Sequence, residues 1–246
     1  QAPPSADVSP DGKKFALVIR GGLYISDTKC KYLQKLATPS DERVYEVVWG
    51  DDSKTVYFTR TDKGWTNLYK IPADGSAGES PVFISENNTK CLESDPKREK
   101  MAFIDGDRAV MLLDMKAGTV VKVAEAEFWS FEGYRLSFSN DGNWLAFDAM
   151  HMFESDIFLY NLKDKSLRNF THSASMEQSP VFTPDGKYMY LLANLTSTSF
   201  PRGARPSLYK LPLRKYDTPF KSENVEDLFK DKKDKPKKDS TVVIDF

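Results

Sequence analysis

One turn recurs five times along this chain, and it constrains the fold more than any other feature. Its clearest copy, Thr-Pro-Asp-Gly-Lys at residues 183–187, separates an apolar-leaning stretch (179–182) from an aromatic and aliphatic one (188–192). Pro184 presets its backbone φ, and Gly186 can adopt a positive φ without steric cost. Between them, Asp185 can accept a hydrogen bond from the backbone ahead of it. The pattern predicts a strand, a tight turn and a second strand.

The repeats have a nearly constant period. The strands that follow the five turns begin near residues 14, 55, 100, 144 and 188, so successive starts are 41, 45, 44 and 44 residues apart. Each unit also contains a third strand pattern, and the first four contain a weaker fourth one. The third strands are expected at 23–26, 67–72, 110–114, 156–160 and 207–212, and the fourth at 32–36, 81–84, 119–124 and 167–171. Four short strands in each unit of about 40–45 residues are typical of propeller blades.

We therefore predict an all-β fold, a β-propeller of four-stranded antiparallel blades with five recognisable blades. A β-sandwich is the alternative, but a sandwich does not repeat its turn chemistry at a fixed period. The five units either close into a five-bladed ring or form part of a larger ring of six or seven blades. In the second case, the two end blades would expose edge strands and apolar faces.

The repeat pattern divides the chain into three parts. Residues 1–213 hold blades one to five, with an enlarged hairpin at 194–206 in the fifth. Residues 214–240 alternate charges of opposite sign with few apolar residues, which predicts a charged insertion or linker. Residues 241–246 form an apolar pattern that we expect to be a strand continuing or closing the propeller. That pattern stops midway, as though more chain followed.

Composition excludes several classes of function. The net charge of −1 provides no global field to attract nucleic acid. No apolar stretch is long enough to span a membrane, and no signal-peptide pattern is visible. The chain begins with Gln1 rather than Met, which indicates a processed form or a fragment, so the missing leader says little about its compartment. Cys30 and Cys91 fall in different units, and we expect no disulfide between them.

The sequence contains no recognisable catalytic motif. It has two histidines, His151 and His172, and no Gly-x-Ser-x-Gly elbow. No pair of His or Cys residues has metal-ligand spacing, and the glycine patterns of phosphate and dinucleotide sites are missing. We therefore expect no catalytic residue, no metal and no cofactor in this stretch of chain.

Binding is the remaining kind of function. In a propeller, the hairpins between second and third strands and the links between blades gather loop residues into shared surfaces. Arginine can bind a peptide carboxylate with two hydrogen bonds, and tryptophan offers apolar area at low entropic cost. The candidate peptide-binding residues are Arg20, Arg43, Trp65, Trp129, His151, His172, Arg202 and Arg205. The alternatives are a solvated loop position for each Arg and His and inter-blade packing for each Trp.

Several stretches resemble the second propeller of tricorn-type proteases. Residues 9–16 with Arg20-Gly21 resemble its opening, and residues 41–49 with 67–69 resemble its next blade. The most specific part is the run from 188 to 246, with its long loop, charged insertion and final Val-Val-Ile-Asp-Phe. The resemblance implies a non-catalytic propeller that guides peptides in a large serine peptidase. It also implies that the chain stops before that family's PDZ domain and tail-specific-type peptidase core.

Two further hypotheses remain open. Similar blade turns occur in TolB-like, WD40-like and prolyl-oligopeptidase propellers, so the chain could be a stand-alone TolB-like or WD40-like interaction module. An intrinsic hydrolase of another kind is the third hypothesis. The tricorn resemblance implies that the partners are peptides or unfolded polypeptide, the remaining domains of the same chain, and further copies in a homo-oligomer. It also implies a periplasmic or secreted location, with a cytoplasmic one as the alternative.

Overall fold

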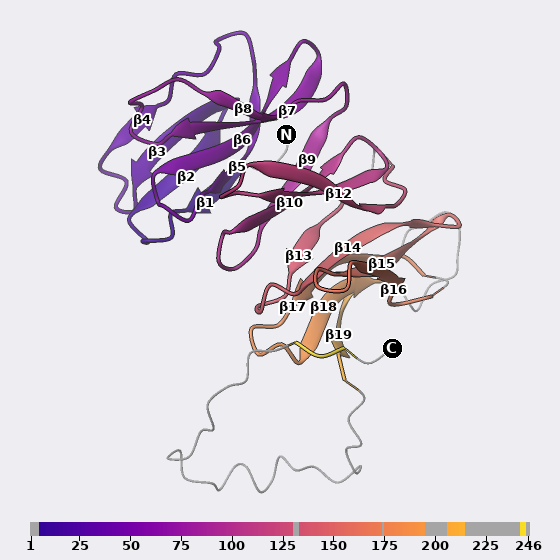
Figure 1. The fold of residues 1–246 in the computed structure, drawn as a ribbon. Helices are drawn as coiled ribbons and strands as arrows, with labels where there is room; N and C mark the ends of the chain where they lie inside the picture. Colours follow the sequence, from indigo (N-terminus) through magenta and orange to yellow (C-terminus); the bar gives the residue numbers. More distant parts are fainter. Residues whose placement is uncertain (1–4, 130–132, 174, 195–205, 215–241, 245–246) are drawn as a thin grey trace, which may run out of the picture.

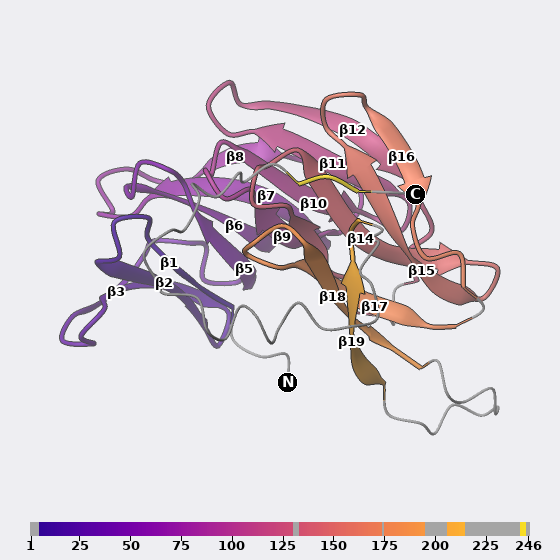
Figure 2. The same ribbon diagram turned by 90° about the horizontal axis from the view of Figure 1, so that it is seen from below.

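The fold is all-β throughout the described residues. The computed structural model describes residues 5–129, 133–173, 175–194, 206–214 and 242–244. They form nineteen strands and no helix, so none of them belongs to a helix that could serve as a membrane span. The strands make five antiparallel sheets that follow one another along an arc (Figures 1 and 2). The predicted architecture of antiparallel blades is confirmed.

Four of the five blades have four strands within the described residues, and the fifth has three. Their bounds follow the chain in order. Blade 1 comprises β1 (Ala6–Val8), β2 (Lys14–Ile19), β3 (Gly22–Asp27) and β4 (Leu33–Lys35). Blade 2 comprises β5 (Val44–Trp49), β6 (Thr55–Asp62), β7 (Trp65–Pro72) and β8 (Ser80–Phe83). Blade 3 comprises β9 (Thr89–Ser94), β10 (Lys100–Asp105), β11 (Ala109–Asp114) and β12 (Thr119–Glu125). Blade 4 comprises β13 (Leu136–Phe138), β14 (Trp144–His151), β15 (Glu154–Asn161) and β16 (Ser166–Asn169), and blade 5 comprises β17 (Glu177–Phe182), β18 (Tyr188–Ala193) and β19 (Ser207–Pro212).

The repeated turn joins the first and second strands of each blade, and blades 1, 4 and 5 share one hydrogen-bond scheme in it. In blade 1, the Gly12 N–H donates to the Ser9 carbonyl at 2.8 Å, and the Ser9 hydroxyl donates to the Asp11 carboxylate at 2.6 Å. The glycines of three copies, Gly12, Gly142 and Gly186, have φ values of 69°, 69° and 66°. Because this left-handed conformation suits glycine, the sequence pattern marks the turn correctly.

The apolar core is divided into four clusters, each between two successive blades. The alternation of side chains along a strand supplies both faces of each sheet. In blade 2, Trp49 and Phe58 face blade 1, whereas Tyr57 and Leu68 face blade 3. Trp49 is fully buried. The core of this molecule is therefore a row of inter-blade contacts.

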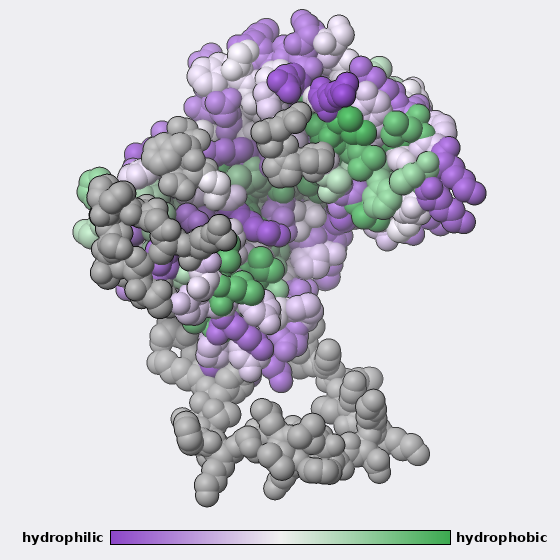
Figure 3. All heavy atoms as spheres, turned by 180° about the vertical axis from the view of Figure 1, so that it is seen from behind, coloured by the Kyte–Doolittle hydropathy of each residue, from purple (hydrophilic) through white to green (hydrophobic). Residues whose placement is uncertain are grey.

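The two end blades lie apart, and none of the four clusters joins blade 5 to blade 1 (Figure 1). The described part of the chain is thus an open arc and not a closed five-bladed ring. Viewed from behind, its surface shows separate hydrophobic patches (Figure 3). Exposed apolar side chains of the end blades include Val8 and Ile19 in blade 1, and Tyr190 and Leu208 in blade 5.

Residues 242–244 pack against blades 4 and 5 without pairing in any of the five sheets. The Val242 N–H donates to the Asp141 carboxylate at 2.7 Å, and Val242 and Ile244 are buried in the cluster between these blades. A Cβ on Gly186 would lie 3.0 Å from Val242 Cγ2. Whether residues 241–246 continue or close the propeller stays a prediction. Residues 195–205 of the enlarged hairpin (194–206) and the charged insertion from residue 215 onward lie outside the described residues.

Candidate functional site

The antiparallel topology gives every blade two distinct ends. We call the end with the hairpins between second and third strands and the links between blades the hairpin end. The opposite end, with the repeated turns and the loops between third and fourth strands, is the turn end. All six described candidate residues lie at the hairpin end, on blades 1, 2 and 4 or on the links beside them. Arg202 and Arg205 lie outside the described residues.

Two predicted arginines meet the hairpin of blade 1. Arg20 stands in this hairpin with a φ of 51°, and Arg43 lies on the link that enters blade 2. A Cβ on Gly21 would lie 3.2 Å from Arg43 Nε, so the hairpin and the Arg43 side chain are in close contact. The Val44 N–H donates to the Gly21 carbonyl at 2.9 Å, which fixes the link beside the hairpin. Both arginines are exposed and form no ion pair with another described residue.

The hairpin of blade 4 carries an apolar tip that the sequence analysis did not identify. Met152 and Phe153 form its two-residue loop, with φ values of 48° and 70°. Their side chains are 84% and 77% exposed, so two large apolar groups stand in solvent. Trp129, from the preceding link, contacts Phe153 edge-on with ring centroids 6.3 Å apart. Their only sequence signal is two bulky apolar residues between the strands, without the glycine or asparagine typical of such loops.

The remaining candidates are scattered over the same end. Trp65 is 41% exposed at the start of β7, and His172 is exposed on the link after β16 with a φ of 45°. His151 is exposed at the end of β14, next to the apolar tip. The described candidate residues therefore share the hairpin end, but they do not form a compact cluster. The peptide-binding role of each candidate stays a prediction.

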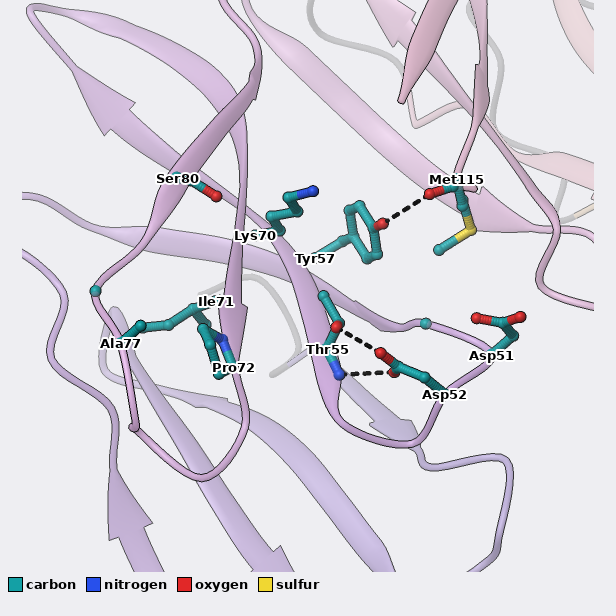
Figure 4. A pocket seen from close by; sticks show the side chains of 12 residues that line it. Asp51, Asp52, Thr55, Tyr57, Lys70, Ile71, Pro72, Ala77, Ser80 and Met115 are labelled. Atoms are coloured by element: carbon teal, nitrogen blue, oxygen red, sulfur yellow. Dashed lines mark hydrogen bonds between the residues drawn. The ribbon is translucent and has the colours of Figure 1, made fainter. Parts of the chain in front are cut away.

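A pocket of about 500 Å³ opens at the turn end, between blades 2 and 3 (Figure 4). The Tyr57 hydroxyl donates to the Met115 carbonyl at 3.3 Å and so connects the two blades beside it. Its lining comes from blade 2 except for Met115 of blade 3, and no sequence motif predicted it. It is lined by Gly50, Asp51, Asp52, Thr55, Tyr57, Lys70, Ile71, Pro72, Ala77, Gly78, Ser80 and Met115.

The two adjacent aspartates of this pocket differ in their partners. Asp52 organises the turn, because its carboxylate accepts from the Thr55 N–H and the Thr55 hydroxyl, both at 2.7 Å. Although burial raises the pKa of Asp52, hydrogen bonds from Thr55 and Lys54 outweigh burial and hold the pKa below its usual value. Asp51 is exposed and accepts no hydrogen bond from another described residue. Figure 4 shows Asp51 on the turn and Lys70 across the Tyr57 ring from it.

The first strands of neighbouring blades contact one another along the inner side of the arc. Asp7 on β1 accepts the Trp49 N–H at 2.7 Å and two hydrogen bonds from the Arg98 guanidinium, at 2.6 and 3.0 Å. Arg98 also donates to the Trp49 carbonyl at 3.0 Å. Because Arg98 belongs to the repeated turn of blade 3, one side chain ties blade 3 to blades 1 and 2.

Two glutamates on these first strands have perturbed acidity. Glu46 on β5 accepts the Cys91 N–H at 3.0 Å, and burial raises the pKa of Glu46 to about 7. Burial also raises the pKa of Glu93 on β9 to about 7, against the opposing effects of Arg135 and Arg98. Burial and the nearby Glu46 raise the pKa of the Cys91 thiol to about 12, so this cysteine is protonated and unreactive at neutral pH. Within the described residues, no group of three or more His, Cys, Asp or Glu residues is arranged to hold a metal ion.

Comparison with known proteins links the chain to parts of larger peptidases. No family model matches it. The chain is 24% identical over 166 residues to the uncharacterized peptidase YuxL of Bacillus subtilis, covering 65% of this chain and 23% of that protein. It is also 24% identical over 196 residues to the tricorn protease of Thermoplasma acidophilum, covering 76% of this chain and 18% of that protein. The chain thus spans about a fifth of the length of these curated relatives.

Solved structures agree with the sequence matches. The crystal structure of the tricorn protease matches with a TM-score of 0.64 and 19% identity, over 87% of this chain and 23% of that chain. A putative TolB from Agrobacterium tumefaciens matches with a TM-score of 0.58 and 16% identity, over 85% of this chain and 76% of that chain. These likenesses confirm the β-propeller fold class.

Proposed function

We infer that this chain, which is homologous to one part of the tricorn protease, is a non-catalytic β-propeller domain of a tricorn-like serine peptidase. The partial coverage carries the inference: the chain matches 18% and 23% of two much longer proteins, both of them peptidases by name. In this role, the propeller guides peptide substrates or products, or scaffolds the assembly.

The hairpin end is the surface that we assign to peptides. It combines the exposed Arg20 and Arg43 with the apolar tip of Met152 and Phe153. Guanidinium groups can bind peptide carboxylates and carbonyls, and exposed apolar side chains can receive apolar peptide side chains. The proposed partners are peptides or unfolded polypeptide, the remaining domains of the same protein, and further copies of it. A periplasmic or secreted location belongs to the same proposal.

The open arc supports a role as part of a larger protein. Blades 1 and 5 expose apolar side chains at the positions where inner blades meet a neighbour. Additional blades from the same protein would cover these faces, as each inner blade is covered here. Open apolar edges are a liability for a protein that has no partner for them.

The test begins with the gene. We expect the reading frame beyond Phe246 to encode further blades, a PDZ domain and a serine peptidase core. The whole protein should cleave unstructured peptides, whereas the 246-residue chain alone should show no turnover. A reading frame without a peptidase region would contradict the proposal, and so would robust hydrolysis by the 246-residue chain.

A stand-alone TolB-like interaction propeller is the second candidate. It is favoured by one observation: the match to the putative TolB covers 76% of that chain, a far larger share than the tricorn match covers. The two candidates differ in their ligands. Binding of labelled unstructured peptides, weakened by Arg43→Ala or Trp129→Ala, would support peptide guidance. Binding of a folded protein domain without any peptide binding would support the second candidate.

A further inference from the structure

We propose that the pocket at the turn end, between blades 2 and 3, binds a short peptide as a zwitterion. The ammonium terminus lies at Asp51 and the carboxylate terminus at Lys70. This inference rests on the proposed function, because that function makes free peptides ligands of this chain. It adds a binding site at the end of the blades opposite to the hairpin end.

The charges of the pocket are available to a ligand. Asp52 is occupied by the Thr55 backbone and hydroxyl, whereas Asp51 and Lys70 form no ion pair or hydrogen bond with another described residue. Asp51 and Lys70 are exposed side chains that line the same pocket. A carboxylate and an ammonium group on two sides of one cavity match a ligand with opposite charges at its two ends.

The Tyr57 ring lies between these charges (Figure 4). Pro72, Ala77 and Met115 add aliphatic surface to the lining, whereas the Ile71 side chain is buried in the cluster between blades 1 and 2. The pocket therefore combines polar groups that orient a ligand with a smaller apolar part, which an apolar peptide side chain can contact.

The dimensions limit the ligand to a short peptide. The volume of about 500 Å³ lies within the range of about 300–1,000 Å³ typical of small-molecule pockets. Gly78 lines the pocket, and a Cβ there would meet no atom within 4 Å. A larger side chain at position 78 therefore fits beside the pocket without displacing the surrounding chain.

The experiment is a calorimetric titration of the 246-residue chain with the dipeptide Ala-Leu. We expect Asp51→Asn and Lys70→Gln each to weaken binding about tenfold, because each loses one charge-assisted contact. Gly78→Val should abolish binding by filling the pocket. N-acetyl-Ala-Leu should bind weakly and lose its dependence on Asp51, and the C-terminal amide should lose its dependence on Lys70.

Matched controls separate the pocket from general charge effects. Lys54→Gln and Asp41→Asn remove exposed charges outside the pocket, and both should leave Ala-Leu binding unchanged. Unchanged melting temperatures would show that the variants are folded.

The possible failures are distinguishable. If Ala-Leu does not bind, or binds equally to Asp51→Asn and Lys70→Gln, the pocket inference is wrong. Peptide guidance still stands in that case if longer unstructured peptides bind through the hairpin end. If neither Ala-Leu nor longer peptides bind, the peptide-guiding function falls as well. Equal binding of N-acetyl-Ala-Leu and Ala-Leu would overturn the assignment of the ammonium terminus to Asp51.

Discussion

At the scale of single residues, the inner strands carry carboxyl groups in unequal environments. The Glu46 carboxylate accepts the Cys91 N–H, whereas Glu93 accepts no hydrogen bond from another described residue. Burial raises the pKa of Glu93 to about 7, so its ionised form is disfavoured in the folded chain. Ionisation of Glu93 therefore opposes folding at neutral and alkaline pH.

The first prediction concerns Glu93→Gln. An unfolded glutamate ionises near pH 4.5, and folded Glu93 ionises near pH 7. As pH rises between these values, the unfolded state releases its proton first, so the native state loses stability relative to it. Above pH 7 the penalty is complete. The variant should therefore raise the free energy of unfolding by about 1–2 kcal/mol at pH 8 and by much less at pH 5.

Denaturant unfolding at pH 5 and pH 8 measures this difference. Glu99→Gln is the matched control, because Glu99 lies in the repeated turn that follows β9 and is exposed. If Glu93→Gln raised the free energy of unfolding equally at both pH values, ionisation of Glu93 would not be the cause.

The second prediction concerns Arg98. Its guanidinium donates twice to Asp7 and once to the Trp49 carbonyl, and the two charged side chains are only 20% and 22% exposed. Arg98→Ala should lower the free energy of unfolding by about 2 kcal/mol, since partly buried charge-assisted hydrogen bonds are lost. A double-mutant cycle with Asp7→Asn measures the coupling. If the effects of the two changes on the free energy of unfolding were additive, the ion pair would contribute nothing to stability.

At the scale of elements, the hairpin of blade 4 departs from the preferred chemistry of its turn. A two-residue loop with two positive φ angles favours Asn-Gly, yet Met152 and Phe153 occupy it. Residues other than glycine in this conformation cost of order 1 kcal/mol each. An exposed and strained apolar tip is more consistent with an interaction surface than with a purely structural turn.

The third prediction tests the strain in this hairpin. Met152→Asn should raise the free energy of unfolding by about 0.5–1 kcal/mol, because asparagine tolerates positive φ better than methionine. Met152→Ala is the control: it removes the same exposed side chain without relieving the backbone. Thermal unfolding of both variants is the measurement. Equal stabilities of the Asn and Ala variants would show that the turn is not strained.

The element scale also shows what the sequence could and could not predict. The repeated turns were predictable, because an Asp-Gly pair such as Asp185-Gly186 acts locally and recurs at the same place in three of the five copies. The same register places Trp49 at the end of a first strand, and the structure buries it there. The Met152–Phe153 loop was not predictable, because its residues contradict the usual turn preference. The contact between Arg98 and Asp7 spans 91 residues and has no local signal.

At the scale of the whole molecule, the described chain is an arc whose two end blades each have an open face. On β19, Tyr209 and Leu211 pack toward blade 4, so the alternate residues Leu208 and Lys210 face away from it. Leu208 is 67% exposed. The sequence allowed either a closed ring or an open arc, because blade number does not determine closure. Only the placement of the blades decides between them for the described residues.

The fourth prediction follows from this open face. We expect the 246-residue chain to self-associate at high concentration through its end blades, and Leu208→Lys should weaken that association several-fold. Val121→Lys is the control, because Val121 is also exposed but lies on the fourth strand of an inner blade. Sedimentation over a range of concentrations is the measurement. Equal association of both variants would place the contact elsewhere.

The clamp of Arg98 on Asp7 has a consequence for the order of events during synthesis. Among the five blades, blade 1 is synthesised before blade 2, on which it packs, but Arg98, which binds Asp7, arrives only with the turn of blade 3, 91 residues later. Domains generally begin to fold as they emerge, at about 5–20 residues per second. Blade 1 therefore lacks the ion pair with Arg98 for several seconds during synthesis, and in that interval it depends on its contacts with blade 2.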